Sequence, residues 1–314
     1  MTRRDVLISA ASAAAAAATA AATGILQAQE KSIPIIDTHQ HLWDLSRFRL
    51  PWVTEASPLN RSFTPEDYHR AAAGLNIVKA VYMEVDVAED QQQAEVDALT
   101  ELCRSGKTVT VAAVVSGRPD HPQFREYLKQ FRNNHYVKGV RRVLHVPSTP
   151  RGHCLTDAFI AGIRALGDMG LSFDLCMRSD ELSDAAKLLD ACPDTRFILD
   201  HCGNEDVKKK NHEPWRRDIA ELARRKNVVA KISGIIASAP PDSWQPEQLA
   251  PIIHHTLDVF GPDRVMFGSD WPVCTLTASL RQWVEALRQI VSSRPESEQR
   301  RLFHDNALKF YGLG

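Results

Sequence analysis

The chain has 314 residues, of which 44% are hydrophobic and 25% are charged, and its formal net charge is -1. This ordinary globular composition excludes a disordered or low-complexity protein. The near-neutral charge provides no broad electrostatic field for nucleic acid or an anionic membrane surface, so we expect a small molecule as the ligand.

Residues 1–30 predict an export signal rather than a part of the fold. Arg3 and Arg4 precede an uncharged, alanine-rich stretch that runs from Val6 to Ala28 and contains small residues near its end. Paired arginines before such a stretch are similar to a twin-arginine signal, with cleavage expected near Ala28. An uncleaved membrane anchor is the alternative, because the stretch is about long enough to span a bilayer. We therefore expect an exported, periplasmic protein whose folded domain covers residues 31–314.

From residue 33 onward, short β-branched runs alternate with amphipathic stretches. The runs predict eight strands, at 33–38, 77–84, 108–115, 138–145, 171–176, 196–201, 227–232 and 264–269. Helices are predicted over 91–104, 123–133, 180–191 and 276–292, and a further helix over 296–311 that covers the barrel. Apolar runs of this kind are typical of strands that are buried on both faces of a parallel sheet. The pattern predicts an α/β protein with a single (β/α)8 barrel.

An open, doubly wound sheet is the alternative fold. No GxGxxG sequence follows the first strand, which removes the commonest dinucleotide-binding form of that fold. The six cysteines form no CxxC pair, so they are expected to be free and mostly buried thiols.

Two histidines stand at the end of the first predicted strand, in the sequence Ile35-Ile36-Asp37-Thr38-His39-Gln40-His41. Because side chains alternate along a strand, His39 and His41 point the same way. Two imidazoles that converge at a strand end are half of a metal site. Surface histidines also occur at this spacing by chance, so the pair needs further ligands to carry a function.

His201 ends the sixth predicted strand and Asp270 ends the eighth. Taken alone, His201 is explained equally well as a core histidine and Asp270 as a helix N-cap. Together with His39 and His41, however, they lie at the same ends of three strands. In a barrel these ends surround one mouth, where the active site is expected.

The chain resembles the amidohydrolase superfamily, in the branch of sugar lactonases and pyrone dicarboxylate lactonases. The resemblance covers residues 33–314 and rests on HQHLWD (39–44), GVRR (139–142), LDHCG (199–203), KISG (231–234), FGSDWP (267–272) and NALKFYG (306–312). It implies that His39, His41, His201 and Asp270 hold one divalent metal such as zinc, with Asp270 as the general base and His201 also catalytic. Some lactonases of this branch work without a metal, so metal-free catalysis is the alternative. Members of the superfamily with two metals usually carry a carboxylated lysine on the fourth strand. The only lysine on that strand here, Lys138, lies at the end far from the mouth, so a second metal is not expected.

The resemblance and the strand positions also predict residues that contact substrate. Arg141 shares a face of the fourth strand with His145, and a guanidinium suits recognition of a carboxylate or carbonyl oxygen. Trp43 and Trp52 are candidates for a wall over a sugar ring, and loop packing is the alternative role for both. Glu84 is expected to touch substrate or a cationic partner. Lys231 is expected to bind an anion or to form a salt bridge.

The expected activity is the opening of a small lactone, either a sugar lactone or a dicarboxylate-derived one, by water attack. A metal-dependent nonoxidative decarboxylase with the same ligands is the alternative enzyme. A passive periplasmic binding protein is the remaining alternative, although it has no use for the four metal-type residues.

Overall fold

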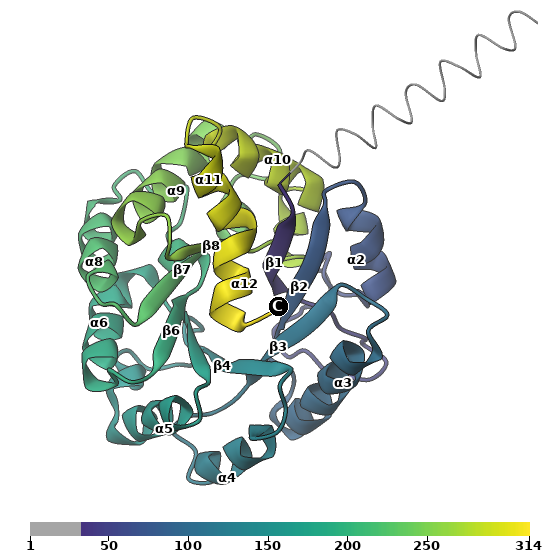
Figure 1. The fold of residues 1–314 in the computed structure, drawn as a ribbon, viewed down its shortest axis with the longest axis vertical. Helices are drawn as coiled ribbons and strands as arrows, with labels where there is room; N and C mark the ends of the chain where they lie inside the picture. Colours follow the sequence, from purple (N-terminus) through teal and green to yellow (C-terminus); the bar gives the residue numbers. More distant parts are fainter. Residues whose placement is uncertain (1–32) are drawn as a thin grey trace, which may run out of the picture.

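Eight parallel strands follow one another around the sheet in chain order in the computed structural model, which describes residues 33–314 (Figure 1). They are β1 (Ile35–Gln40), β2 (Ile77–Met83), β3 (Thr110–Ser116), β4 (Val137–Val143), β5 (Ser172–Cys176), β6 (Arg196–Leu199), β7 (Val228–Ile232) and β8 (Val265–Phe267). All eight predicted strands and the barrel architecture are confirmed. The predicted export signal lies outside the described residues.

Hydrogen bonds between β1 and the segment after β8 draw the two edges of the sheet together. The amide of Asp270 donates to the carbonyl of His39 at 2.8 Å, and the amide of His41 donates to the carbonyl of Trp271 at 2.7 Å. The residues that close the barrel are therefore the predicted site residues and their neighbours.

Helices cover the outside of the strands (Figure 1). They are α2 (Pro65–Ala72), α3 (Gln92–Ser105), α4 (Phe124–Leu128), α5 (Asp157–Asp168), α6 (Leu182–Ala191), α8 (Glu213–Ala223), α9 (Pro246–Phe260) and α10 (Leu280–Ile290). The short α7 (His201–Asn204) follows β6 directly, and α11 (Glu296–Arg300) and α12 (Asn306–Tyr311) end the chain. Helix α2 begins where local chemistry dictates, because Thr64 forms a capping box with Asp67 and Pro65 occupies the first turn.

Strands β6 and β8 end two residues earlier than the sequence predicts. His201 and Asp270 have left-handed backbone conformations, with φ of 54° and 56°, which strand geometry does not allow. Non-glycine residues in this region carry backbone strain, and such strain is concentrated at functional sites. The two side chains therefore leave from tight turns directly beyond the strands.

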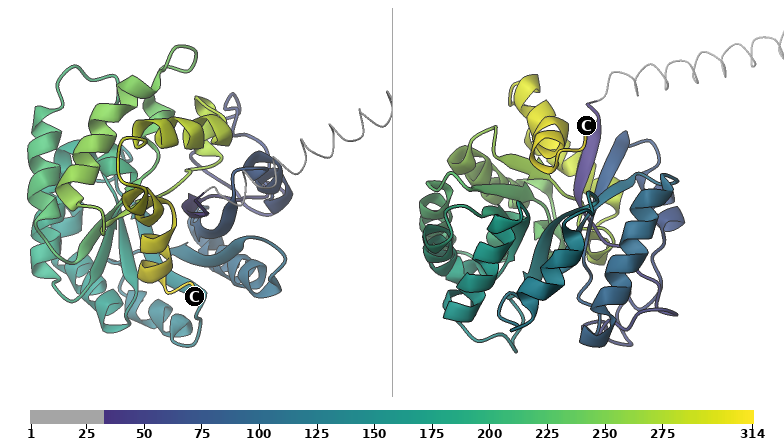
Figure 2. Two further views of the ribbon diagram at one scale, coloured as in Figure 1. Left: turned by 45° about the horizontal axis from the view of Figure 1, so that its top comes forward. Right: turned by 60° about the horizontal axis from the view of Figure 1, so that its bottom comes forward.

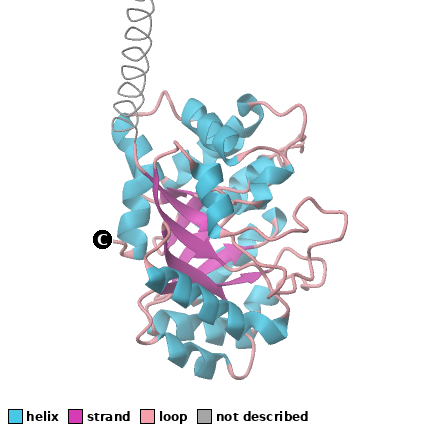
Figure 3. Ribbon diagram, turned by 90° about the vertical axis from the view of Figure 1, so that its right-hand side faces the viewer, coloured by secondary structure: helices cyan, strands magenta, loops and turns pink. Residues whose placement is uncertain are grey.

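The barrel interior has its own apolar layer, separate from the larger core between strands and helices. It contains Ile36, Val81, Met83, Val114, Ile198 and Met266 from the strands, and Ala307, Tyr311 and Leu313 from the C-terminal segment. Helix α12 lies across one end of the barrel (Figures 1 and 2), as the sequence predicts for 296–311. Long loops extend from the molecule on the side away from the C terminus (Figure 3).

All six cysteines are free and buried, as expected. Within residues 33–314, no helix combines the length and apolarity needed to cross a membrane.

Candidate active site

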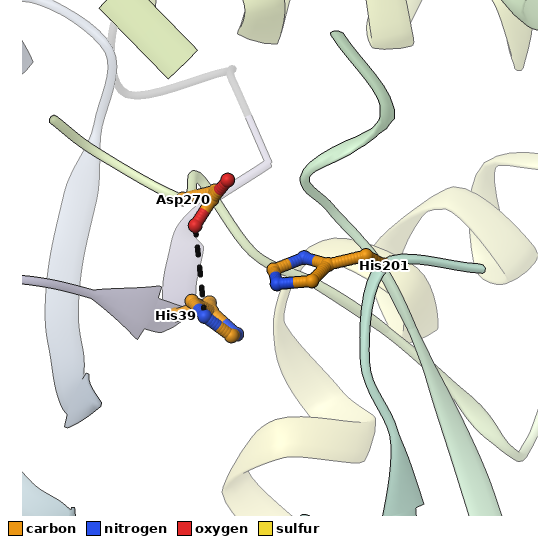
Figure 4. Close-up of side chains that lie close together, drawn as sticks. All are labelled: His39, His201 and Asp270. Carbon is orange, nitrogen blue, oxygen red and sulfur yellow. Dashed lines mark ion pairs between the residues drawn. The ribbon is translucent and has the colours of Figure 1, made fainter. Parts of the chain in front are cut away.

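The four predicted metal-type residues meet beyond the strand ends. The Nε2 atoms of His41 and His39 lie 3.3 Å and 3.6 Å from Oδ1 of Asp270. One ligand atom from each of His39, His201 and Asp270 lies within 4.8 Å of the other two (Figure 4). Residues from three distant parts of the chain therefore form one cluster.

Outer partners fix the orientation of the imidazole rings. Nδ1 of His41 lies 2.9 Å from the carbonyl oxygen of Met83, which can only accept, so this nitrogen carries the proton. Nδ1 of His201 pairs with Oγ of Ser233 at 3.0 Å. Partners of this kind are typical of histidines that bind a metal through the other ring nitrogen. The Nε2 lone pair of His41 is therefore directed at Asp270.

Burial and local charge set the protonation of the cluster. Burial holds the pKa of His39 well below its usual range and also lowers the pKa of His201, so both rings are neutral near pH 7. Burial by itself would raise the pKa of Asp270, but the nearby His201 and the close contact with His41 lower it to about 2. Neutral imidazoles beside an ionised carboxylate are the states that metal binding and proton abstraction require.

Glycines in the motifs KISG and FGSDWP make room for the histidines. A Cβ on Gly234 would lie 2.2 Å from Nδ1 of His201, and a Cβ on Gly268 would lie 2.7 Å from Cβ of His39. Neither position can accept a side chain without moving a ring of the cluster. The two glycines are therefore part of the site, because only they allow the backbone this close.

Asp37 connects the backbone of His39 to the segment that carries Asp270. Its buried carboxylate accepts hydrogen bonds from the amides of Ser269 at 2.8 Å and His39 at 3.1 Å, and from the hydroxyl of Tyr68 at 2.7 Å. Sequence reasoning did not assign Asp37 a role. A carboxylate inside an apolar strand, two residues before His39, is the signal that could have identified it.

Arg141 is buried beside the cluster. Its Nε and Nη2 donate to Oε1 and to the backbone carbonyl of Glu84, both at 2.6 Å, and its Nη1 lies 3.2 Å from Nε2 of His39. Arg142 points away toward Asp120, as strand alternation predicts. Arg141 is therefore a cationic partner of Glu84.

A cavity of about 380 Å³ opens above the cluster. Its lining includes the predicted residues His41, Trp52, Arg141, His145, His201 and Asp270. Burial lowers the pKa of His145 to about 4, so this ring is neutral. A hollow of about 430 Å³ against α2 contains none of these six residues.

Three predicted substrate contacts, Trp43, Glu84 and Lys231, lie outside the lining of this cavity. Trp43 packs against Phe63 and the edge of Trp52, which is the loop-packing alternative. Glu84 is occupied by Arg141. Lys231 is completely buried, and its Nζ lies 2.5 Å from Asp174 and 3.1 Å from Asp200, so the salt-bridge alternative holds.

Asp174 and Asp200 are the acids that sequence reasoning missed. Both are fully buried. Burial by itself would raise the pKa of Asp200, but the charge of Lys231 and the contact with His39 hold it well below its usual range. A charged residue in the middle of an apolar strand, as in Ser172-Phe173-Asp174-Leu175-Cys176, is the signal that could have indicated a buried charge.

Comparison with known proteins gives consistent matches along the chain. The amidohydrolase family model matches residues 36–313. An uncharacterized protein of Sinorhizobium fredii is 30% identical over 89% of this chain and 98% of its own length. An L-fucono-1,5-lactonase of Burkholderia multivorans is 26% identical over 88% of this chain and 96% of its own length. A crystal structure of a Burkholderia multivorans amidohydrolase with bound zinc superposes with a TM-score of 0.80, at 26% identity, over 89% of this chain and 99% of that one.

Proposed function

The chain belongs to the amidohydrolase family, and from this premise we propose that it hydrolyses the ester bond of a small lactone. The observation that carries the proposal is the ionised Asp270 at the base of a cavity, between neutral imidazoles and within reach of a buried arginine. The similarity to an L-fucono-1,5-lactonase supports the same reaction class.

The site supplies the groups that ester hydrolysis needs. Asp270 accepts a proton from water, whose oxygen attacks the lactone carbonyl. The guanidinium of Arg141, which is fixed by Glu84, lines the cavity and stabilises the oxyanion of the tetrahedral intermediate. The ring C–O bond then breaks, the ring oxygen takes up the proton, and a hydroxy acid is released. His201 lies beside Asp270 and lines the cavity, where its neutral ring helps to position the attacking water.

The donor set also fits one divalent metal. His39, His201 and Asp270 would hold it, because one ligand atom of each lies within 4.8 Å of the other two, and we assign His41 as the fourth ligand because its Nε2 lies 3.3 Å from Oδ1 of Asp270. The outer partners of His41 and His201 are those of metal ligands. A bound metal supplies Lewis acidity and lowers the pKa of water. The zinc in the related Burkholderia amidohydrolase supports this assignment. In the structure, Nε2 of His39 faces Nη1 of Arg141, so ligation by His39 requires that this contact is given up.

Zinc is expected to stabilise the folded protein. At a free concentration of about 100 times Kd, it should raise the free energy of unfolding by about 2.7 kcal/mol, because only the folded chain assembles the ligands. Thermal unfolding of metal-stripped protein with and without zinc measures this. The variant H41Q should lose the increase. H145Q is the matched control, since His145 lines the cavity outside the cluster, and an equal loss in both variants would contradict the assignment.

The charges of the cavity favour a neutral, hydroxyl-rich lactone over a dicarboxylate. The positive charge of Arg141 is already neutralised by Glu84. Two carboxylates, those of Asp86 and Asp270, line the cavity. A second carboxylate on the substrate would therefore be repelled. Asp86, Asn204 and Ser238 offer hydrogen bonds to hydroxyl groups, and Trp52 offers a ring face.

We expect proton release at neutral pH with aldono-lactones and little or none with pyrone dicarboxylate. The measurement uses the full-length protein with a pH indicator, and it is repeated after chelation to separate metal-assisted from metal-free hydrolysis. Preference for the dicarboxylate would contradict the charge argument. Absence of turnover of every lactone by zinc-loaded protein would overturn the hydrolase proposal, and release of CO2 from aromatic acids would then support a decarboxylase.

A further inference from the structure

A layer of buried charges lies between the active-site cluster and the apolar interior of the barrel. It contains Lys231 on β7, Asp174 on β5, and Asp200 directly after β6, all with no exposed surface. Nζ of Lys231 lies between the two carboxylates, 2.5 Å from Oδ2 of Asp174 and 3.1 Å from Oδ1 of Asp200. None of the three lines the cavity, so direct contact with substrate does not explain them.

The two carboxylates differ in what else they touch. Oδ1 of Asp200 lies 3.4 Å from Nδ1 of His39, and Oδ2 lies 3.7 Å from Nη1 of Arg141. Asp174 is hydrogen bonded to Lys231 and forms no ion pair with a histidine of the cluster among the described residues. Asp200 therefore joins the buried lysine to the active site.

The two ring nitrogens of His39 have different surroundings, since Nε2 faces Nη1 of Arg141 at 3.2 Å and Nδ1 faces Asp200. Nδ1 of His39 and both carboxylate oxygens of Asp200 are buried, and none of them makes a well-aligned hydrogen bond within the described part of the chain. Buried polar atoms are nearly always satisfied, so the 3.4 Å approach is the pairing available to both residues. Since a carboxylate accepts and cannot donate when ionised, Nδ1 of His39 must carry the proton.

We propose that Asp200, held by Lys231, is the positioning residue that fixes the tautomer of His39. The carboxylate accepts the Nδ1 proton, which leaves the Nε2 lone pair facing Asp270 at 3.6 Å. Lys231 lies 3.1 Å from the same carboxylate and fixes it in place. Histidine ligands and bases elsewhere depend on carboxylates in the same way.

The floor of the barrel keeps this layer dry. Tyr311 of α12 is 3% exposed and interacts electrostatically with Lys231, and the apolar interior layer surrounds it. Figure 1 shows α12 across this end of the barrel. Because water is excluded, the interactions of Lys231 act at short range and with little screening.

The matched variants D200N and D174N test the proposal. Each removes one carboxylate from Lys231 and leaves the other, but only D200N changes the partner of His39. We expect D200N to raise the Kd for zinc roughly 10–100-fold, measured by competition with a chromophoric chelator, and D174N to leave it nearly unchanged. An equal effect of both variants would mean that the layer only stabilises the fold, and would overturn the proposal.

The tautomer itself is measured on the metal-free, full-length wild type by two-dimensional NMR of 15N-labelled histidine, with the His39 signals assigned by their loss in H39N. We expect a protonated Nδ1 and an unprotonated Nε2, and the opposite tautomer would overturn the proposal even if the variants fail to fold. The inference rests on the proposed site. This readout needs neither zinc nor turnover, so a failure of the lactonase proposal is distinguishable from a failure of this one.

Discussion

Replacing Asp270 with asparagine is expected to lower kcat for lactone hydrolysis by about 10²–10⁴-fold, because the amide cannot accept the proton of the attacking water. KM should change much less, since the side chain keeps its size. Oδ1 of Asp270 lies 3.3 Å from Nε2 of His41 and 3.6 Å from Nε2 of His39, so D270N removes the charge around which the imidazoles are arranged. Initial rates by proton release, together with thermal unfolding, measure both effects.

The matched control for this variant is D86N. Asp86 is the other carboxylate that lines the cavity, and it is paired with Arg118 at 3.2 Å instead of with the histidines. We expect D86N to raise KM for hydroxyl-rich lactones while leaving kcat close to that of the wild type. A D270N enzyme that retains most of its kcat, or a D86N enzyme that loses as much, would rule out Asp270 as the base.

Replacing Arg141 with methionine is expected to damage both stability and catalysis. Glu84 is completely buried and would lose its guanidinium partner, and breaking a buried pair in this way costs about 3–5 kcal/mol. The oxyanion would also lose a donor, which is worth about 10²–10³-fold in kcat. Urea unfolding and initial rates measure the two losses separately.

The double variant R141M/E84Q separates the two roles of Arg141. Removing the charge of Glu84 as well should recover much of the lost stability, because no buried ion is left unpaired. Activity should stay low, because the guanidinium is still absent. Recovery of activity together with stability would show that Arg141 acts only as the counter-ion of Glu84.

Local sequence determined the barrel and the main part of the candidate site. The β-branched runs and amphipathic stretches predict all eight strands in order, since parallel strands buried on both faces need continuous apolar sequence. The barrel then brings His39, His41, His201 and Asp270 together, because the ends of all strands lead to the same mouth. The alternation predicted over 138–145 also placed Arg141 and His145 on one side, and both line the cavity although β4 itself ends at Val143.

Only the tertiary structure decided which charged residues pair with one another and which of them reach the cavity. Glu84 and Arg141 are 57 residues apart, and so are Lys231 and Asp174, so local spacing could not indicate either pair. Lys231 is completely buried and Arg141 lines the cavity, and only the packing of the closed barrel distinguishes the two. The sequence by itself determines the periodicity of each strand and its order, because these depend on neighbouring residues. The depth and the partner of each charge depend on the register of strands that are distant in the chain, and this register exists only once the barrel has closed.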